Sequence, residues 1–318
     1  MRAVPALQYE IYMLKYLSIR CVTALIVILG VATLVFMLIH IVPGDPVEVM
    51  LGESAQPADA EALRNALGLN LPLYQQWLNF MSHLGTLDLG TSLHTQRAIT
   101  SLLWERMPAT LLLACTSLTI AIAIALPLGM LAAVRRGSRW DVMAMTFSML
   151  GISIPGFWLG PLLIMVFSLW LGWFPVSGRE GIASLVLPAV TLGTALAALL
   201  ARMVRAALLE VLNEDYIRAA RARGLSTTAV VWRHGLANAA LPIITVLGMQ
   251  FGALLAGAVI TETIFSWPGI GQLVVEAIQK RDYPVVQTCV LLISFSYVVV
   301  NLLTDLAYAV LDPRVRLA

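Results

Sequence analysis

The sequence has 318 residues, of which 59% are hydrophobic and 12% charged, and its formal net charge is +2. A soluble domain carries about a quarter charged residues, so this composition indicates an integral membrane protein and argues against nucleic-acid binding. Three dispersed cysteines, Cys21, Cys115 and Cys289, form no disulfide framework and match no metal-ligand spacing. We expect them to be packing residues.

The first expected span covers residues 21–42 and follows a basic segment, residues 1–20. About 22 residues with a rise of 1.5 Å reach roughly 33 Å, enough to cross a hydrocarbon core of about 30 Å. A signal peptide fits poorly, because the apolar run is too long and Ile-Val-Pro-Gly-Asp-Pro at its end is no small-x-small cleavage site. We predict a retained first transmembrane helix.

Residues 43–108 are polar enough to lie in water, and we expect them to be periplasmic. Turn residues at Pro43–Pro46 end the first span. Two short helices are predicted, Pro57–Leu67 and Pro72–Leu84, each followed by a glycine. Apolar residues recur at helical spacing in the second, which favours a position on the membrane surface or against the spans.

Residues 109–311 hold five further apolar runs and form the expected transmembrane core. The runs are Ala109–Val134, broken at Pro127-Leu128-Gly129; Val142–Trp173; Ile182–Leu209; Ala239–Thr261; and one within Tyr283–Leu311. The second of these holds Ile154-Pro155-Gly156, so it is either one kinked, tilted helix or a span followed by a re-entrant piece. The predicted fold is therefore all-α, a polytopic membrane protein with six transmembrane helices.

The basic residues predict the orientation of these spans. With the N-terminus inside and six spans, most of the 20 Lys and Arg residues fall on the cytoplasmic side. A count of five or seven spans would lose this bias. Residues 210–238 then form a cytoplasmic loop, residues 262–283 a periplasmic loop, and residues 312–318 a cytoplasmic C-terminus.

Polar side chains share one helix face in the last span. They are Ser294, Tyr297, Asn301, Asp305 and Tyr308. A carboxylate within a span usually faces the bundle interior or a water-filled cavity. The stripe therefore either borders a solute path or makes interhelical hydrogen bonds, with Asp305 near the cytoplasmic interface.

Small residues recur at every fourth position in two spans. They are Gly193, Ala197 and Ala201 in one span and Gly248, Gly252 and Ala256 in the next. This spacing lets helices approach closely. We expect tight packing, with sliding during a conformational change as the alternative.

The 262–283 loop begins at Glu262 and contains a tryptophan, Trp267, that suits a membrane interface. No Gly or Pro occurs from Gln272 to Gln279, so a short helix is expected there. This helix either dips back toward the mouth of the pore or belongs to an ordinary external loop.

Motifs of covalent chemistry are absent from the sequence. Neither lysine, Lys15 or Lys280, lies in a Gly-x-x-x-x-Gly-Lys phosphate loop, and no His-Glu-x-x-His occurs. Gly151–Pro155 resembles a nucleophile elbow only until its fifth residue. We expect no enzymatic activity, and neither a cofactor nor a metal bound by this chain.

Several segments together resemble the B-type permease subunit of bacterial dipeptide and oligopeptide ABC importers, whose relatives also import glutathione or nickel complexes. The segments are Pro43–Pro46, Asp88–Ser92, Glu214–Gly224, Asn238–Pro242, Phe265–Gly269 and Arg281–Pro284. This set is specific, and the resemblance runs from about residue 13 to residue 316. The first twelve residues precede it, so the natural start is either Met1 or Met13.

The resemblance implies a type I ABC importer permease in the bacterial inner membrane. It implies four partners: a second related permease, two cytoplasmic ATPases that hold ATP and Mg²⁺, and a periplasmic solute-binding protein. The expected solute is peptide-like. The resemblance does not say which peptide, glutathione or nickel complex passes.

The loop around Tyr216–Arg223 resembles the helix that such permeases present to their ATPases. The implied coupling residues are Glu214, Asp215, Tyr216, Arg218, Ala219, Ala220, Arg223 and Gly224. Small Ala219 and Ala220 would allow close docking, and Gly224 would end the helix. Arg218 stands where Glu is common in other ABC permeases. The arginines would pair with acidic residues of the ATPase, set the topology, or do both.

The implied periplasmic gate residues are Phe265, Trp267, Pro268, Gly269, Arg281, Asp282 and Tyr283. Candidates for either the solute path or helix packing are Glu262, Asn301 and Asp305. An alternative function is an ATP-independent secondary transporter or channel that uses Asp305 and Glu262 as proton or ion sites.

Overall fold

The computed structural model describes residues 6–41, 47, 61, 64–65 and 68–311. The predicted turn Pro43–Pro46, most of the predicted helix Pro57–Leu67 and the C-terminal residues 312–318 lie outside the described residues. Within the described part of the chain, regular structure is helical apart from one isolated antiparallel bridge between Thr91 and Ala98. The all-α prediction is confirmed.

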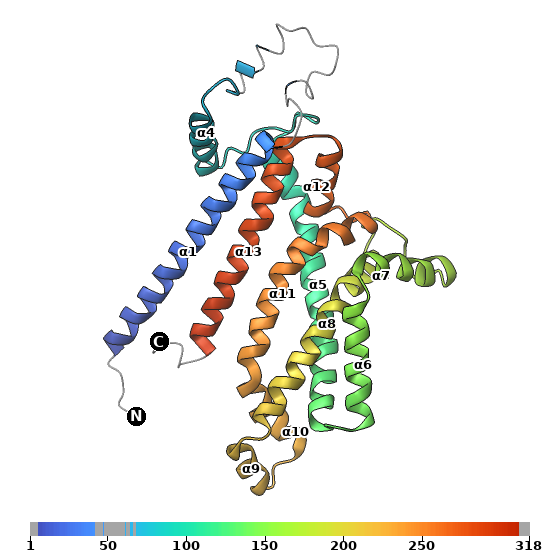
Figure 1. The fold of residues 1–318 in the computed structure, drawn as a ribbon. Helices are drawn as coiled ribbons and strands as arrows, with labels where there is room; N and C mark the ends of the chain where they lie inside the picture. The colour runs from blue at the N-terminus through green and yellow to red at the C-terminus, as the bar shows by residue number, and fades with distance from the viewer. Residues whose placement is uncertain (1–5, 42–46, 48–60, 62–63, 66–67, 312–318) are drawn as a thin grey trace.

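Long helices form the body of the molecule (Figure 1). They are α1 (Ala6–Ile41), α5 (Ile99–Val134), α8 (Ala183–Val211), α11 (Leu236–Ile264) and α13 (Tyr283–Leu311). Among the described residues, five helical stretches are long and apolar enough to cross a membrane. A sixth span results if α6 (Arg139–Ser153) and its continuation to Trp170 count as one broken span. The prediction of six spans agrees with this arrangement.

Two helices begin earlier than their hydropathy predicts. Helix α1 begins at Ala6 and α5 at Ile99, and α5 continues through both Pro108 and Pro127. The predicted break at Pro127 is wrong. A proline inside a transmembrane helix is tolerated because neighbouring groups satisfy the freed carbonyl. The helices begin early because hydropathy indicates where a helix enters the lipid and not where its first turn forms.

The run from 142 to 173 is divided at Ile154-Pro155. Ile154 is extended, as residues before proline commonly are, and ends α6. Pro155 precedes α7 (Gly156–Leu163), and the π-helix η1 (Ile164–Trp170) continues it. The two halves are bent by 100°. They therefore do not form one tilted helix, and the second half projects sideways from the bundle (Figure 1).

Small residues bring the spans into close contact. A Cβ added to Gly129 would lie 2.7 Å from Val204, between α5 and α8. A Cβ at Gly252 would lie 2.7 Å from the ring of Tyr297, between α11 and α13. Tight packing at the predicted small-residue stripe is therefore confirmed for Gly252, while sliding stays a prediction.

The predicted helix near residue 72 is α4 (Leu73–Gly85), and it packs against the first span. Trp77 Nε1 donates a hydrogen bond to Thr33 Oγ1 at 3.1 Å, and the rings of Phe36 and Phe80 lie 5.7 Å apart. Helix α1 in turn contacts α13, where Gln287 Nε2 donates to Val35 O at 2.9 Å.

Short helices occupy the two ends of the bundle (Figure 1). At one end, α9 (Asp215–Ala222), α10 (Thr227–Ala229) and the π-helix η2 (Val230–Gly235) connect α8 to α11. At the other end, α12 (Ile270–Gln279) connects α11 to α13. Helix α1 begins and α13 ends at the same end of the bundle as α9.

Candidate functional site

Helix α9 has well-defined ends. Glu214 is extended before its first turn, and Gly224 adopts a φ of +83°, a left-handed conformation that only glycine takes without steric cost. Gly224 N donates a hydrogen bond to Arg221 O at 2.9 Å and so closes the last turn. The expected short helix is present, shifted by one residue from the predicted Tyr216–Arg223.

The two faces of α9 differ. Ile217 and Ala220 are 0% and 1% exposed and pack with Val230 of η2. Val211 and Leu212, at the end of α8, lie against this cluster. The exposed face carries Tyr216, Arg218, Ala219, Arg221, Ala222 and Arg223.

One predicted docking role is therefore wrong. Ala219 is exposed, but the side chain of Ala220 faces the chain's own apolar cluster and cannot enter a groove of another protein. Its small size serves the attachment of α9 to the spans. A docking role for the exposed residues of α9 stays a prediction.

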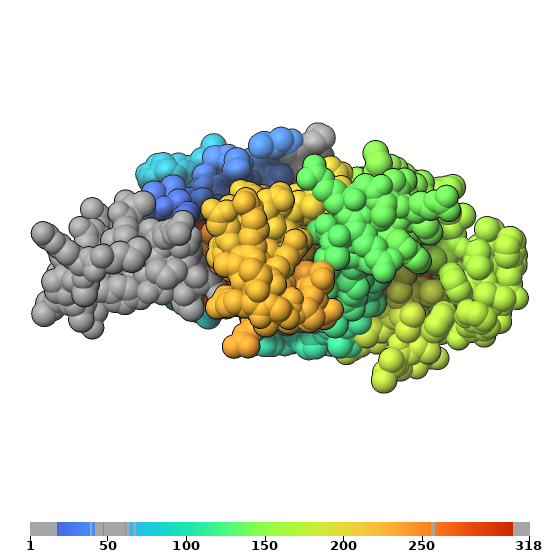
Figure 2. Space-filling model, turned by 90° about the horizontal axis from the view of Figure 1, so that it is seen from below, coloured from blue at the N-terminus to red at the C-terminus, as the bar shows by residue number. Residues whose placement is uncertain are grey.

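The polar groups of α9 are mostly in water. Arg218 and Asp215 form an ion pair of 3.2 Å with side chains 73% and 92% exposed, a geometry that contributes little to stability. Partial burial raises the pKa of the Tyr216 hydroxyl, and the negative charge of Glu214 adds to this. Figure 2 shows this end of the molecule, where the segment around α9 lies over the middle of the face.

At the opposite end, the Phe265–Gly269 segment is buried instead of lying at a membrane interface. Phe265 and Trp267 are 2% and 1% exposed. Trp267 Nε1 donates a hydrogen bond to Ala109 O at 2.9 Å, and the guanidinium of Arg179 lies 5.7 Å from the tryptophan ring. The interface placement of Trp267 is wrong because its ring fills the contact between α5 and α8.

The next residues, Pro268 and Gly269, lead into α12 close to a buried carboxylate, Glu262. Glu262 belongs to the last turn of α11 and is 0% exposed, so it does not begin an external loop as predicted. It accepts hydrogen bonds from Thr110 Oγ1 at 2.7 Å and from Gln272 N at 3.1 Å. Thr110 also accepts from Ile270 N at 2.8 Å. Glu262 therefore joins α5 and α11 to the first turn of α12.

A second carboxylate, Asp282, holds the other end of α12. Asp282 is 4% exposed and accepts hydrogen bonds from Ser92 Oγ at 2.5 Å, Leu93 N at 3.2 Å and His94 N at 3.4 Å. The preceding residue, Arg281, is exposed with a φ of 54°. The Asp88–Ser92 and Arg281–Pro284 segments thus meet, a pairing that the sequence analysis did not predict.

Tyr283, the last predicted gate residue, begins α13 and is partly exposed. Buried carboxylates therefore hold α12 at both ends, against α5 and α11 at its start and against residues 92–94 at its end. Whether Pro268, Gly269 or Tyr283 lines a gate stays a prediction.

Three residues of the polar stripe of α13, Tyr297, Asn301 and Asp305, line a cavity shared with α1. Arg20 Nε and Asp305 Oδ2 lie 3.2 Å apart, and Asn301 and Tyr297 line the same cavity of about 250 Å³ between the two helices. The ion pair gives Asp305 an interhelical partner, whereas the role of Asn301 in the solute path or in helix packing stays a prediction.

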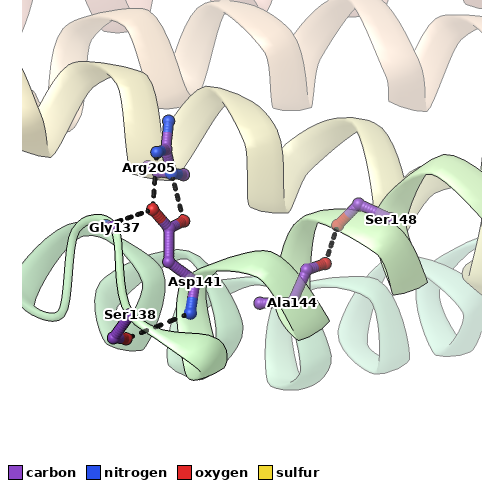
Figure 3. Close-up of polar contacts among 6 residues, drawn as sticks. All are labelled: Gly137, Ser138, Asp141, Ala144, Ser148 and Arg205. Atoms are coloured by element: carbon purple, nitrogen blue, oxygen red, sulfur yellow. Dashed lines mark hydrogen bonds and ion pairs between the residues drawn. The ribbon is translucent and has the colours of Figure 1, made fainter.

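Sequence reasoning missed an ion pair between α6 and α8. Arg205 Nε lies 2.6 Å from Asp141 Oδ1, and Arg205 Nη2 donates to Asp141 Oδ2 at 2.8 Å (Figure 3). In the sequence, Arg205 is simply one of the basic residues that predict the orientation of the spans. The available signal was Asp141 itself, the only acidic residue between Glu105 and Glu180, placed at the start of an apolar run.

Comparisons with known proteins agree with this architecture. Residues 125–317 match the family described as binding-protein-dependent transport system inner membrane component, and residues 13–114 match the N-terminal family of the same membrane component. The chain is 44% identical to the di/tripeptide transport system permease protein DppB of Pseudomonas aeruginosa (strain UCBPP-PA14). It is 42% identical to the glutathione transport system permease protein GsiC of Escherichia coli (strain K12). Each alignment covers 96% of this chain and 99% of the relative.

A solved structure shows the same fold. An inward-facing conformation of the MetNI methionine ABC transporter matches with a TM-score of 0.58 and 22% sequence identity, over 67% of this chain and 97% of that chain. The helical architecture and the extent of the family match together identify the molecule. The chain belongs to the family of inner membrane components of binding-protein-dependent transport systems, as a permease subunit of an ABC importer.

Proposed function

We propose that this permease moves a di- or tripeptide, or a related solute such as glutathione, into the cytoplasm, and that ATPases docked on α9 drive it. The proposal rests on the observation that α9 has one face buried against the spans and one face exposed. Its buried face holds Ile217 and Ala220 against the spans, and its exposed face presents three arginines and Ala219. The solute class follows from the names of the relatives at 44% and 42% identity.

The proposed assembly contains a second related permease, two ATPases that hold ATP and Mg²⁺, and an external solute-binding protein. Most basic residues lie on the side of α9, and by the positive-inside rule this supports a cytoplasmic position for α9 and both termini. The α12 end is then periplasmic and faces the binding protein.

Movement of α9 would reach the spans through its buried face. Ile217 and Ala220 contact residues at the end of α8 and in η2, which continues into α11. A displacement of α9 therefore acts on α8 and α11 together. ATP binding would shift the population between inward-open and outward-open states through these contacts.

Uptake by the complete complex in proteoliposomes tests this function. Labelled dialanine, trialanine and glutathione are supplied with the binding protein outside, and ATP is enclosed with the ATPases. We expect uptake of at least one solute that requires ATP hydrolysis. Uptake that continues with ADP in place of ATP would refute the proposal and favour a secondary transporter.

The same assay tests the two carboxylates assigned to that alternative. Asp305 and Glu262 already have partners within the chain, Arg20 for the first and Thr110 for the second. We therefore expect Asp305→Asn to transport at the parent rate when its abundance is matched. Loss of uptake with normal complex assembly would instead indicate that Asp305 takes part in the solute path.

A further inference from the structure

The ion pair between Asp141 and Arg205 fixes orientation as well as distance. Its two contacts of 2.6 and 2.8 Å use two nitrogens of the guanidinium and both oxygens of the carboxylate. A bidentate pair of this kind allows little rotation of either helix, because the planar fork must stay aligned. Asp141 is 5% exposed, so water competes little with the contact.

The same carboxylate organises the turn between α5 and α6. Gly137 N donates a hydrogen bond to Asp141 Oδ2 at 2.9 Å, while Asp141 N donates to Ser138 Oγ, the N-cap of α6, at 3.4 Å (Figure 3). The Asp141 side chain therefore holds the turn and contacts α8, while its backbone N–H caps the start of α6 through Ser138. Loss of the Asp141 carboxylate would remove the hydrogen bonds that hold the first turn of α6 to Gly137 and Arg205.

The rest of the contact between α6 and α8 is made by small side chains. Apart from Asp141, the buried residues of α6 are Ala144, Ser148 and Gly151. A Cβ at Gly151 would lie 2.9 Å from Ala198 Cβ on α8, so the helices touch through small side chains. Such surfaces allow close approach but also sliding. Among the described residues, the Asp141–Arg205 pair is the only hydrogen-bonded side-chain contact between these two helices.

Arg205 also lies near the attachment of α9. Val211, which packs on the cluster of Ile217 and Ala220, follows Arg205 by about 9 Å along the same continuous helix. A displacement of α9 therefore enters α8 just beyond the point where α8 holds α6.

We infer that Asp141 and Arg205 are positioning residues that make α6 move with α8 when the ATPases displace α9. The inference rests on the proposed docking of ATPases at α9. Stability alone is a weak reason for the pair, because Asp141 is buried but the Arg205 side chain is 26% exposed, and replacing even a fully buried ion pair by apolar residues of similar volume is often neutral or stabilising.

A distance measurement in the reconstituted importer tests the inference. The three native cysteines are replaced by alanine, and spin labels are attached to cysteines at Met143 on α6 and Glu210 on α8, both of which are exposed. Double electron–electron resonance measures the distance between the two spin labels, first without nucleotide and then after trapping with ATP and vanadate. Hydrolysis of ATP and uptake of labelled dialanine and glutathione are measured on the same samples.

In the parent complex we expect the distance to be the same in both states. In Arg205→Gln we expect it to differ between the states by up to one helical turn, about 5.4 Å, and uptake per ATP to fall. Arg202→Gln is the matched control, because it removes the same charge from an exposed position three residues earlier. It should keep the parent distances and the parent uptake per ATP.

An equal distance in both states of Arg205→Gln, or a change in the parent itself, would overturn the inference. If Arg205→Gln fails to assemble, Asp141→Leu combined with Arg205→Met removes both charges and leaves none buried alone. This double variant should show the same state-dependent shift, and a constant distance would again refute us. Failure of the proposed function looks different: the parent complex then loses its ATPases or shows no ATP-dependent uptake.

Discussion

Two adjacent alanines of α9 offer a sharp test of its two faces. Ala219 is exposed and Ala220 is 1% exposed, packed with Ile217 and Val230. Ala219→Glu exchanges one good helix former for another at a cost of a few tenths of a kcal/mol. The new carboxylate would also lie one turn before Arg223, a favourable spacing of about 0.3 kcal/mol. Helix α9 should therefore stay folded and attached.

Ala220→Glu places a carboxylate in an apolar cluster without a partner, which costs several kcal/mol. Helix α9 can avoid this cost only by losing its packing contact with the end of α8 and with η2. We thus expect both variants to lose transport, for different reasons. Ala219→Glu blocks docking by charge and bulk, whereas Ala220→Glu detaches α9 from the spans.

Copurification of the ATPases with the tagged permease and limited proteolysis of the 213–226 loop separate the two effects. Ala219→Glu should lose ATPase copurification and keep the parent cleavage rate, whereas Ala220→Glu should be cleaved faster. Full ATPase copurification and uptake by Ala219→Glu would refute docking on the exposed face. Parent cleavage and uptake by Ala220→Glu would refute the assigned burial.

Two further substitutions test the packing that holds the spans. In Glu262→Gln one of the two acceptor oxygens becomes an NH₂ group. Either Gln272 N or the Thr110 hydroxyl then loses its acceptor, at a cost of about 1–3 kcal/mol. Amide hydrogen exchange in the first turn of α12 should accelerate, and unchanged exchange would contradict this. Gly252→Ala brings a Cβ to 2.7 Å from Tyr297 and should lower the thermal midpoint, since overpacking costs about 1–3 kcal/mol. Gly30→Ala, with nothing within 4 Å, should not lower it, and equal midpoints for the two variants would argue against the tight α11–α13 contact.

The site residues differ in how far sequence could predict them. The short helix of the 213–224 loop was predicted from the family resemblance, with its end at Gly224, which indeed has a positive φ. Its orientation was not, because Ala219 and Ala220 are chemically identical and only packing separates them. For the same reason Trp267 was placed at an interface: an indole fits both an interface and a protein core.

Contacts between distant segments were beyond the reach of pattern analysis. Asp282 meets Ser92 across 190 residues, and Arg205 meets Asp141 across 64. A charged residue in an apolar run signals that a partner exists, because an unpaired charge in lipid is costly. It does not identify the partner, since many helix arrangements satisfy the same requirement.

The sequence by itself determined a membrane protein with six apolar runs, the short helices near residues 72 and 272, and a set of segments whose family resemblance implied the helix near residue 216. Each follows from hydropathy, helix-ending residues or a contiguous motif. The tertiary structure decided the rest: the 100° bend after α6, the buried face of α9, the carboxylates that hold α12, and the ion pair between α6 and α8. These depend on which surfaces meet, because burial and hydrogen bonding are properties of pairs of segments and not of any one of them.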